Sequence, residues 1–574
     1  MDYRKIYDEW INNPYFDEET KKELLSIKDD EKEIEERFYK DLEFGTGGLR
    51  GIIGAGINRI NKYNVRKTTQ GFANYILSEV ENAKGKGVVI AYDSRHKSPE
   101  FSMEAAKVLA GNGIKAYVFE SLRTTPELSY SVRELGAAGG IVVTASHNPP
   151  EYNGYKVYGE DGGQLVPQHA NVVIDEIRRI DDYSKVKYLE EEDAKAKGLL
   201  NIIGEEIDRK YIDMVKSLSL RGDVIEKMKD FKIVYTPLHG TGAMAVKRAL
   251  TEIGFENFFP VKEQEVPDSN FSTVESPNPE EHKAFDMAIK LAEEVGADII
   301  IGTDPDCDRV GAVVKNRQGE YQVLTGNQTG SLLVDYILSS MESIPENSVV
   351  IKTIVTSELG GMIAKSYGVE TMNTLTGFKF IGEKIKEFEE KGNKNFIFGY
   401  EESYGYLAGT SVRDKDAVVS SLLIAEMAAY YKSKDMTLLD ALEGLFKKHG
   451  YYREDLKSIV LKGKEGLEKI GRIMDDLRNN PPLQIGEIKT DIIRDYKNGM
   501  SRFVTKDEEK ELDLPKSNVL HYTLEDGSWF AVRPSGTEPK IKIYFSVVGE
   551  SKEDSEKKLN MIKTKVIERI DEIE

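Results

Sequence analysis

Residues 299–309 read IIIGTDPDCDR, a short apolar run that passes directly into a loop with three carboxylates. The run has no polar alternation, which is typical of a strand buried on both faces of a sheet. Similar runs recur, each followed by a loop and an amphipathic helical stretch, at Val88–Tyr92, Ile141–Thr144, Ile233–Tyr235, Val349–Ile354 and Phe396–Phe398. This order predicts an α/β fold on mixed, mainly parallel sheets.

The 574 residues are enough for about three to five domains. The first 44 residues are acidic and helical in pattern, as in Glu31–Tyr39. Helical stretches and polar connectors then predict four domains, over residues 1–215, 216–324, 325–450 and 451–574. In open α/β sheets the chemistry gathers at the carboxyl ends of the strands, so the loops after the apolar runs are the candidate sites.

The net charge of −20 disfavours nucleic acid and anionic membranes as partners. The most apolar long window, Val418–Tyr430, is interrupted by Glu426 and is too short to span a bilayer. The N-terminus carries no signal-peptide pattern, and the single cysteine, Cys307, fits a reducing compartment, so a cytoplasmic protein is expected. The same negative field would repel a phosphorylated substrate, so such a substrate requires cations concentrated in a few loops.

The loop after Ile141–Thr144 contains Ser146 beside His147, stiffened by two prolines. A serine next to a histidine can act as a nucleophile or a phosphoryl acceptor. The plain alternative is a strand-to-helix turn in which Ser146 only caps the helix. The stretch is not a G-x-S-x-G elbow, so it does not indicate a hydrolase of the α/β type.

The loop Asp304–Arg309 places three carboxylates at alternate positions, where they can converge on one hard cation. An EF-hand would need glycine and glutamate where Arg309 and Lys315 stand, so that interpretation fails. Three solvated turn aspartates are the alternative, although like charges this close are costly without a cation. Three oxygens with room for a phosphate oxygen favour Mg²⁺.

Two further loops carry weaker signals. The stretch Gly399–Gly405 offers Glu401 and Ser403 for sugar hydroxyls, although alone it is as typical of a surface loop. The stretch Arg533–Pro539 combines an arginine fork, two hydroxyls and a glycine amide, which suits a phosphate but also a tight turn. The glycines of Gly45–Gly51 miss the dinucleotide spacing and Gly111-x-Gly113 is typical of a helix end, so no nucleotide cofactor is indicated.

Taken together and in this order, the four loops closely resemble those of the α-D-phosphohexomutase superfamily, especially its long bacterial phosphoglucomutase branch. The matching stretches are Thr144–Pro149, Asp304–Arg309, Glu401–Ser403 and Arg533–Thr537. The resemblance covers nearly the whole chain. It implies four domains around a central cleft, three of them α/β and the C-terminal one α+β.

The resemblance also implies roles for individual residues. Ser146 would carry the phosphoryl group, and Asp304, Asp306 and Asp308 would hold Mg²⁺ together with a phosphate oxygen on Ser146. Candidates for acid–base or electrostatic roles near the reacting groups are Arg50, His147, Lys156 and Arg309. Glu401 and Ser403 would hold sugar hydroxyls. The non-reacting phosphate would be gripped by Arg533, Ser535, Gly536 and Thr537. Further substrate-binding candidates beside the loops are Thr376, Gly377, Lys379, Arg413 and Lys415.

The activity implied is the interconversion of glucose 1-phosphate and glucose 6-phosphate, with glucose 1,6-bisphosphate as intermediate and activator. Tyr400 stands where the family usually has glycine, and Tyr404-Gly405-Tyr406 follows the serine of the sugar loop, so the preferred sugar stays open. Phosphopentomutase, phosphomannomutase and a non-catalytic phosphosugar sensor are the alternatives. A phosphatase is disfavoured because a closing fourth domain would exclude water.

Overall fold

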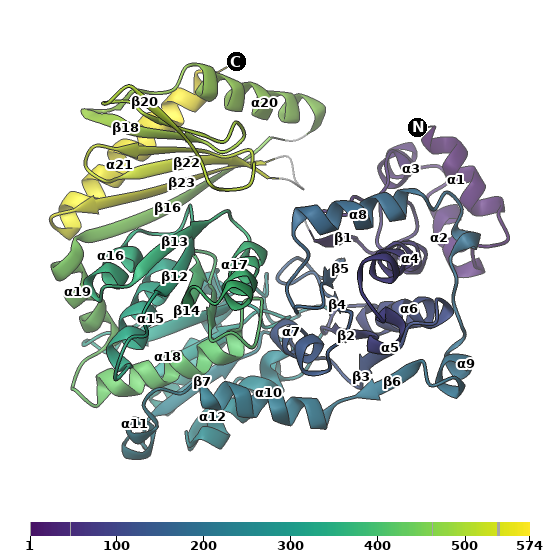
Figure 1. The fold of residues 1–574 in the computed structure, drawn as a ribbon, viewed down its shortest axis with the longest axis horizontal. Coiled ribbons are helices and arrows are strands. Elements are labelled where there is room, and N and C mark those ends of the chain that lie inside the picture. The colour runs from purple at the N-terminus through teal and green to yellow at the C-terminus, as the bar shows by residue number, and fades with distance from the viewer. Residues whose placement is uncertain (1, 46, 462, 536–539, 574) are drawn as a thin grey trace. The chain divides into compact units, whose positions relative to one another are not determined.

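The computed structural model describes residues 2–573 apart from 46, 462 and 536–539 (Figure 1). The chain divides into two compact units. The first comprises residues 1–329, 339–348 and 378–438, and the second comprises residues 330–338, 349–377 and 439–574.

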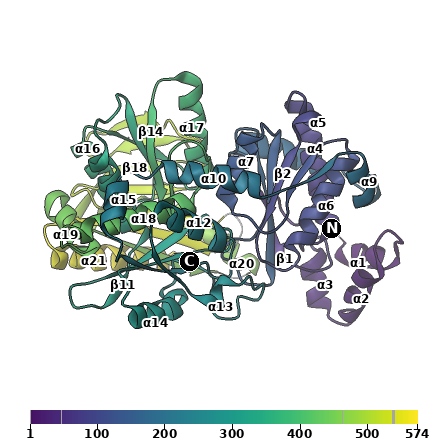
Figure 2. The ribbon, with the colours of Figure 1, turned by 90° about the horizontal axis from the view of Figure 1, so that it is seen from below.

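The N-terminal segment forms three short helices, α1 (Tyr3–Asn12), α2 (Glu18–Ser26) and α3 (Glu31–Phe38), as the acidic helical pattern predicts. Each begins at an aspartate whose side chain accepts a hydrogen bond from a backbone N–H of the first turn. Trp10 stacks on Phe16 with ring centroids 4.1 Å apart, in an apolar cluster that also includes Ala55, Ile57 and Tyr63. The three helices lie beside the domain of the first sheet (Figures 1 and 2).

The first sheet has the strand order β1-β5-β4-β2-β3-β6. Its strands are β1 (Gly48–Ile52), β2 (Val88–Tyr92), β3 (Ala116–Phe119), β4 (Gly139–Val143), β5 (Tyr152–Tyr158) and β6 (Leu200–Ile203). The helices of this region are α4 (Lys62–Glu79), α5 (Ala83–Lys86), α6 (Ser98–Gly111), α7 (Thr125–Glu134), α8 (Pro167–Arg178), α9 (Glu191–Ala196) and α10 (Glu205–Ser217). Val88 and Ile90 of β2 join the core with α4 and α6, whereas Val89 and Ala91 join the core with α7 and α10. The strand is thus buried on both faces, as its unbroken apolar run predicts.

The second sheet has the order β11-β10-β9-β7-β8. Its strands are β7 (Lys232–Thr236), β8 (Asn257–Pro260), β9 (Ile299–Thr303), β10 (Val310–Lys315) and β11 (Tyr321–Val323). The helices beside it are α11 (Gly222–Lys227), α12 (Gly242–Ile253), α13 (Lys262–Glu265) and α14 (Asp286–Val295). β7, β8 and β9 are parallel, and Val234, Ile300 and Val313 pack against α14.

The third region contributes to both units. In the first unit, β14 (Asn395–Glu401) and β15 (Gly405–Ala408) form an antiparallel pair beside α17 (Phe378–Lys391) and α18 (Ala417–Lys432). In the second unit, β12 (Ser348–Thr353) and β13 (Glu370–Thr374) are parallel and α16 (Leu359–Ser366) connects them. The remaining helices are α15 (Gly326–Ser340) and α19 (Leu438–His449). Residues 417–429 of α18 are buried without a break.

The C-terminal region is an antiparallel sheet in the order β16-β23-β22-β21-β18-β19-β20, with β17 paired to β18. The strands are β16 (Tyr451–Val460), β17 (Gln484–Ile485), β18 (Ile488–Asp495), β19 (Met500–Phe503), β20 (Glu508–Glu511), β21 (Leu520–Leu524), β22 (Trp529–Pro534) and β23 (Lys540–Gly549). Two helices, α20 (Gly463–Asn479) and α21 (Lys552–Asp571), share an apolar core with the sheet. The predicted α+β C-terminal domain is confirmed.

Three of the candidate loops connect antiparallel strands, and not a strand to a helix as the repeating order suggests. The Ser146 loop joins β4 to β5, the aspartate loop joins β9 to β10, and residues 402–404 join β14 to β15. Antiparallel neighbours can be joined by a short loop, whereas parallel neighbours need a long crossover. Each loop is therefore anchored to its sheet at both ends. Among the described residues, no helix combines the length and apolarity that crossing a bilayer requires.

Candidate active site

Ser146 lies buried at the start of the loop between β4 and β5, with the left-handed backbone angle φ of 51°. Its backbone N–H donates to Thr144 Oγ1 at 2.8 Å, which fixes this turn. Its hydroxyl donates to Asp304 Oδ2 at 2.6 Å. The structure therefore brings the predicted phosphoryl carrier directly to the predicted metal loop.

His147 Nδ1 lies 3.1 Å from Ser146 Oγ. Burial lowers the pKa of His147 well below its usual value, and the nearby charges of Arg309 and Arg50 lower it further. The imidazole is therefore neutral at ordinary pH, and its Nδ1 can donate or accept a hydrogen bond at the serine oxygen, depending on the tautomer.

Asp304, Asp306 and Asp308 each offer a carboxylate oxygen, and these oxygens lie within 4.8 Å of one another. All three side chains are buried. Asp306 Oδ1 and Asp308 Oδ1 have no hydrogen-bond partner, and buried carboxylate oxygens without partners are costly. Burial, followed by the charges of the other two aspartates, raises the pKa of Asp304 well above its usual range. A hard divalent cation would satisfy these oxygens, so the residues fit the metal site that the spacing predicts.

Two lysines from different domains face this group. Lys156 Nζ donates to Asp306 Oδ2 at 2.8 Å, and Lys415 Nζ lies 3.0 Å from Asp308 Oδ2. Burial opposes their charge, but the aspartates outweigh it and raise the pKa of both lysines. Both groups therefore stay cationic.

Arg309 is half-buried in the site and forms an ion pair with Glu280, which lies in the loop before α14. Burial works against its charge, but Glu280 and Asp308 raise the pKa of Arg309. The carboxylate of Glu401, at the end of β14, also acts on Arg309 and on Lys415. Glu401 of the predicted sugar loop thus lies within electrostatic reach of the metal loop.

Other predicted residues of the first unit lie around this centre. Arg50 is exposed on β1 opposite Gly154, and its charge acts on His147. Lys379 is buried at the start of α17. The Arg413 guanidinium is buried and binds Glu389 and the Thr410 carbonyl, so in this structure it holds its own loop.

The remaining predicted residues belong to the second unit. Thr376 and Gly377 follow β13, and Gly377 has the left-handed φ of 120°. Arg533 lies in β22 opposite Lys542, and Ser535 donates its backbone N–H to the Lys540 carbonyl at 2.8 Å. Gly536 and Thr537 lie outside the described residues.

The structure adds residues that the sequence patterns missed. Thr125, at the start of α7, donates its hydroxyl to Asp306 Oδ2 at 3.0 Å and its N–H to the Asp306 carbonyl at 2.9 Å. Asp93 and Arg95 follow β2, and Arg95 lies beneath the Ser146 loop. The run Val88–Tyr92 is one of those that mark the candidate loops, so its position was a signal for Asp93 and Arg95, whereas Thr125 had none.

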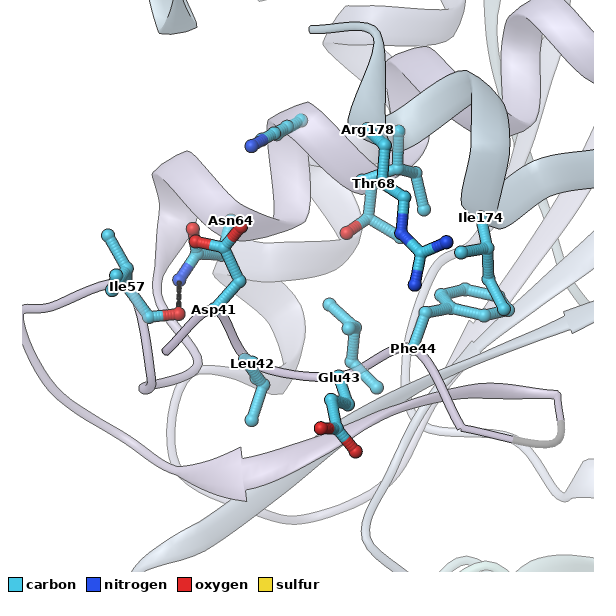
Figure 3. A pocket seen from close by; sticks show the side chains of 12 residues that line it. Asp41, Leu42, Glu43, Phe44, Ile57, Asn64, Thr68, Ile174 and Arg178 are labelled. Carbon is cyan, nitrogen blue, oxygen red and sulfur yellow. Dashed lines mark hydrogen bonds between the residues drawn. The ribbon is translucent and has the colours of Figure 1, made fainter. Parts of the chain in front are cut away.

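A cavity of about 240 Å³ lies apart from this centre, between residues 41–44, β1, α4 and α8 (Figure 3). Phe44, Leu49 and Ile174 give it apolar walls, and Asp41 and Arg178 add charge. It contains none of the predicted site residues.

Comparison with known proteins matches four consecutive family models to the chain. Domains I, II and III of the phosphoglucomutase/phosphomannomutase family, each described as alpha/beta/alpha, match residues 41–184, 209–319 and 325–449. The C-terminal domain of the same family matches residues 453–561.

Whole proteins agree with these matches. A phosphoglucomutase of Staphylococcus epidermidis is 39% identical over 540 residues, which cover 94% of this chain and 96% of that protein. One of Staphylococcus haemolyticus is 39% identical over 513 residues, covering 89% and 91%. The crystal structure of the Paramecium phosphoglucomutase parafusin in its open form has a TM-score of 0.68 at 19% identity, covering 93% and 95% of the two chains. A Burkholderia thailandensis family protein gives 0.65 at 18%, covering 92% and 96%. This chain belongs to the phosphoglucomutase/phosphomannomutase family.

Proposed function

We propose that this protein is a phosphoglucomutase, which interconverts glucose 1-phosphate and glucose 6-phosphate through a phosphorylated Ser146. The observation that carries the proposal is the 2.6 Å hydrogen bond from Ser146 Oγ to Asp304, within a buried group of three aspartates. The similarity to staphylococcal phosphoglucomutases supports glucose as the sugar.

In the reaction, phospho-Ser146 gives its phosphoryl group to the free hydroxyl of a sugar monophosphate. A bond forms between the sugar oxygen and phosphorus while the bond from phosphorus to Ser146 Oγ breaks. The hydroxyl loses one proton and Ser146 Oγ regains one, so the protons balance. His147 Nδ1, 3.1 Å from Oγ, is placed to exchange that proton. The bound glucose 1,6-bisphosphate then turns around and returns its other phosphate to Ser146.

Phosphoryl transfer depends mainly on positioning and on neutralising charge. Lys156 of β5, and Lys415 and Arg309 of two loops, are half-buried cations beside the three aspartates, where they can neutralise the transferred group. Mg²⁺ held by the three aspartates would add positive charge at the phosphoryl oxygens. Asp304 orients the serine hydroxyl in the unphosphorylated enzyme.

The rest of the proposal concerns substrate binding. Glu401 and Ser403 hold sugar hydroxyls, and Arg50, Lys379 and Arg413 add cations beside the site. The non-reacting phosphate binds residues of the second unit, namely Thr376, Gly377, Arg533, Ser535, Gly536 and Thr537. The proposed boundaries between the four domains are residues 215, 324 and 450. A buried, free Cys307 supports a cytoplasmic location.

The test compares kcat/KM for glucose 1-phosphate, mannose 1-phosphate and ribose 1-phosphate, with Mg²⁺ and a trace of the matching bisphosphate. A clear preference for glucose 1-phosphate is expected. A preference for ribose 1-phosphate or mannose 1-phosphate would keep the mechanism and replace the substrate. Binding without turnover would favour a phosphosugar sensor, and release of inorganic phosphate at the turnover rate would favour a phosphatase.

A further inference from the structure

Arg95 is a fully buried cation that the reaction scheme does not use. Its Nη1 donates to the carbonyls of Pro149 at 2.7 Å and Tyr152 at 3.1 Å. Its Nη2 donates to the carbonyl of Ser146 at 2.6 Å and to that of Asn148. Four carbonyls of one short loop therefore converge on a single guanidinium. Only the planar fork of an arginine can serve four acceptors in this arrangement.

Asp93 holds this arginine in place from the end of β2. The Asp93 carboxylate lies 3.3 Å from Arg95 Nε, and it accepts hydrogen bonds from the Arg95 N–H at 2.9 Å and from Thr144 Oγ1 at 2.6 Å. The Thr144 hydroxyl in turn accepts the Ser146 N–H. Both side chains of the Asp93–Arg95 pair are fully buried, so the pair has a fixed geometry and not the looseness of a surface ion pair.

The far side of Arg95 is closed by a segment of the second domain. The guanidinium carbon lies 4.9 Å from the ring centroid of Phe271, a buried residue with the left-handed φ of 49°. The same segment binds the Arg95 loop on both sides: Ser269 Oγ donates to the Ser94 carbonyl at 2.7 Å, and His96 Nε2 lies 2.7 Å from Asn270 Oδ1. The aromatic face offers a cation–π contact and keeps water from the guanidinium.

We propose that Arg95 is the positioning residue of the phosphoserine loop, and that Phe271 keeps it desolvated, so that the segment 268–273 of the second domain sets the rate at which Ser146 exchanges its phosphoryl group. Arg95 touches backbone carbonyls and no reacting atom. It acts by fixing the left-handed turn at Ser146, and thereby the direction of Oγ toward Asp304. The inference rests on the proposed function, because it concerns the same serine.

A positioning role for Arg95 predicts changes in kinetics that a purely structural role would not cause. A lysine keeps the charge, but its three N–H donors all lie on one nitrogen, so it cannot bind the four carbonyls that the two Nη atoms of arginine share. Misplacement of a reacting group by about 1 Å can cost about a hundredfold in rate. Because Arg95 does not contact the substrate, its replacement should lower kcat and leave KM for the sugar phosphate nearly unchanged.

The experiment uses the full-length enzyme with Arg95→Lys and Phe271→Leu. The matched controls are Arg59→Lys and Phe255→Leu. Arg59 is a buried arginine that forms ion pairs with Glu33 and Glu36, and Phe255 is a buried phenylalanine of the second domain. Each variant is assayed below its unfolding temperature for kcat, KM and the rate at which glucose 1,6-bisphosphate phosphorylates Ser146, followed by intact mass.

Arg95→Lys is expected to lower kcat and the phosphorylation rate together, by about tenfold to a hundredfold, with KM within about threefold of the wild type. Phe271→Leu should change them in the same direction by less, and the controls should keep wild-type kcat whatever they lose in Tm. Normal kcat in Arg95→Lys, or a change confined to KM, would overturn the inference. If Arg95→Lys does not fold, Phe271→Leu decides in the same way. A wild-type enzyme that is never phosphorylated on Ser146 would instead refute the proposed function.

Discussion

Ser146 Oγ and Asp304 Oδ2 are 2.6 Å apart, although their loops belong to different sheets and the two residues are separated by 158 positions in the sequence. The two hairpin loops that carry them meet at this bond. The serine is thus held by the same aspartate that belongs to the candidate metal site. Loss of either partner should affect the reaction in a different way.

Replacing Ser146 by alanine removes the phosphoryl carrier. The variant should lose turnover by about a thousandfold or more, because the other groups only position and stabilise. It should still bind glucose 1-phosphate, which calorimetry can measure. Ser102→Ala is a matched control, since Ser102 is a fully buried serine in α6 whose hydroxyl has no partner. Normal turnover in Ser146→Ala would refute the phosphoserine mechanism.

Asp308→Asn tests the metal site. The amide removes one anionic ligand, so the Mg²⁺ concentration for half-maximal activity should rise by about tenfold or more. Chelation with EDTA should abolish wild-type activity, and Mg²⁺ should restore it. Asp308 also faces Lys415, so the thermal stability of the variant is measured in parallel. Full activity in EDTA would argue that the three aspartates serve only to pair with Lys156, Lys415 and Ser146.

Glu280→Gln tests how Arg309 is held. The ion pair with Glu280 directs the half-buried guanidinium, and a neutral amide would release it. The expected result is a fall in kcat of about tenfold, measured with saturating glucose 1-phosphate. Glu275→Gln, at an exposed ion pair with Lys283, is the control and should have no effect. Equal kcat in the two variants would show that Arg309 needs no such support.

Asp416 gives a prediction about pH and stability. It begins α18 and accepts hydrogen bonds from the N–H groups of Val418 and Val419 and from the Tyr211 hydroxyl, all at 2.9 Å. Burial raises the pKa of Asp416 from 3.8 to about 6. Between these values the folded state binds a proton that the unfolded state does not, so stability falls as pH rises from about 4 to about 6 and stays lower above.

Asp416→Asn should remove this fall, because the amide does not ionise and its oxygen still caps the helix. Urea unfolding at pH 5 and pH 7.5 measures the effect. The change between the two pH values should be smaller in the variant than in the wild type by about 1 kcal/mol. An unchanged difference would mean that Asp416 is already ionised at pH 5.

The positions of the central strands could be predicted from the sequence, because a strand buried on both faces is a continuous apolar run. The run Val88–Tyr92 coincides with β2 at both ends. The sequence did not reveal that β5 returns antiparallel after Ser146, since Asn153, Gly154 and Lys156 break its apolar pattern. The run Val88–Tyr92 marked the loop that carries Arg95, but not what Arg95 does there, because its partners are mainly backbone carbonyls, which every residue has. The role of such a residue becomes evident only when the loop around it is seen in space.

Each of the three hairpin loops carries one non-glycine residue in the left-handed region: Ser146, Cys307 and Tyr404, with φ of 51°, 56° and 63°. At the first of these positions the backbone, and not the chemistry, restricts which amino acid can be the nucleophile. Threonine has an equivalent hydroxyl, but its branched Cβ is a steric outlier at positive φ. The choice of serine over threonine as phosphoryl carrier is thus made by the shape of a turn, before any substrate is bound.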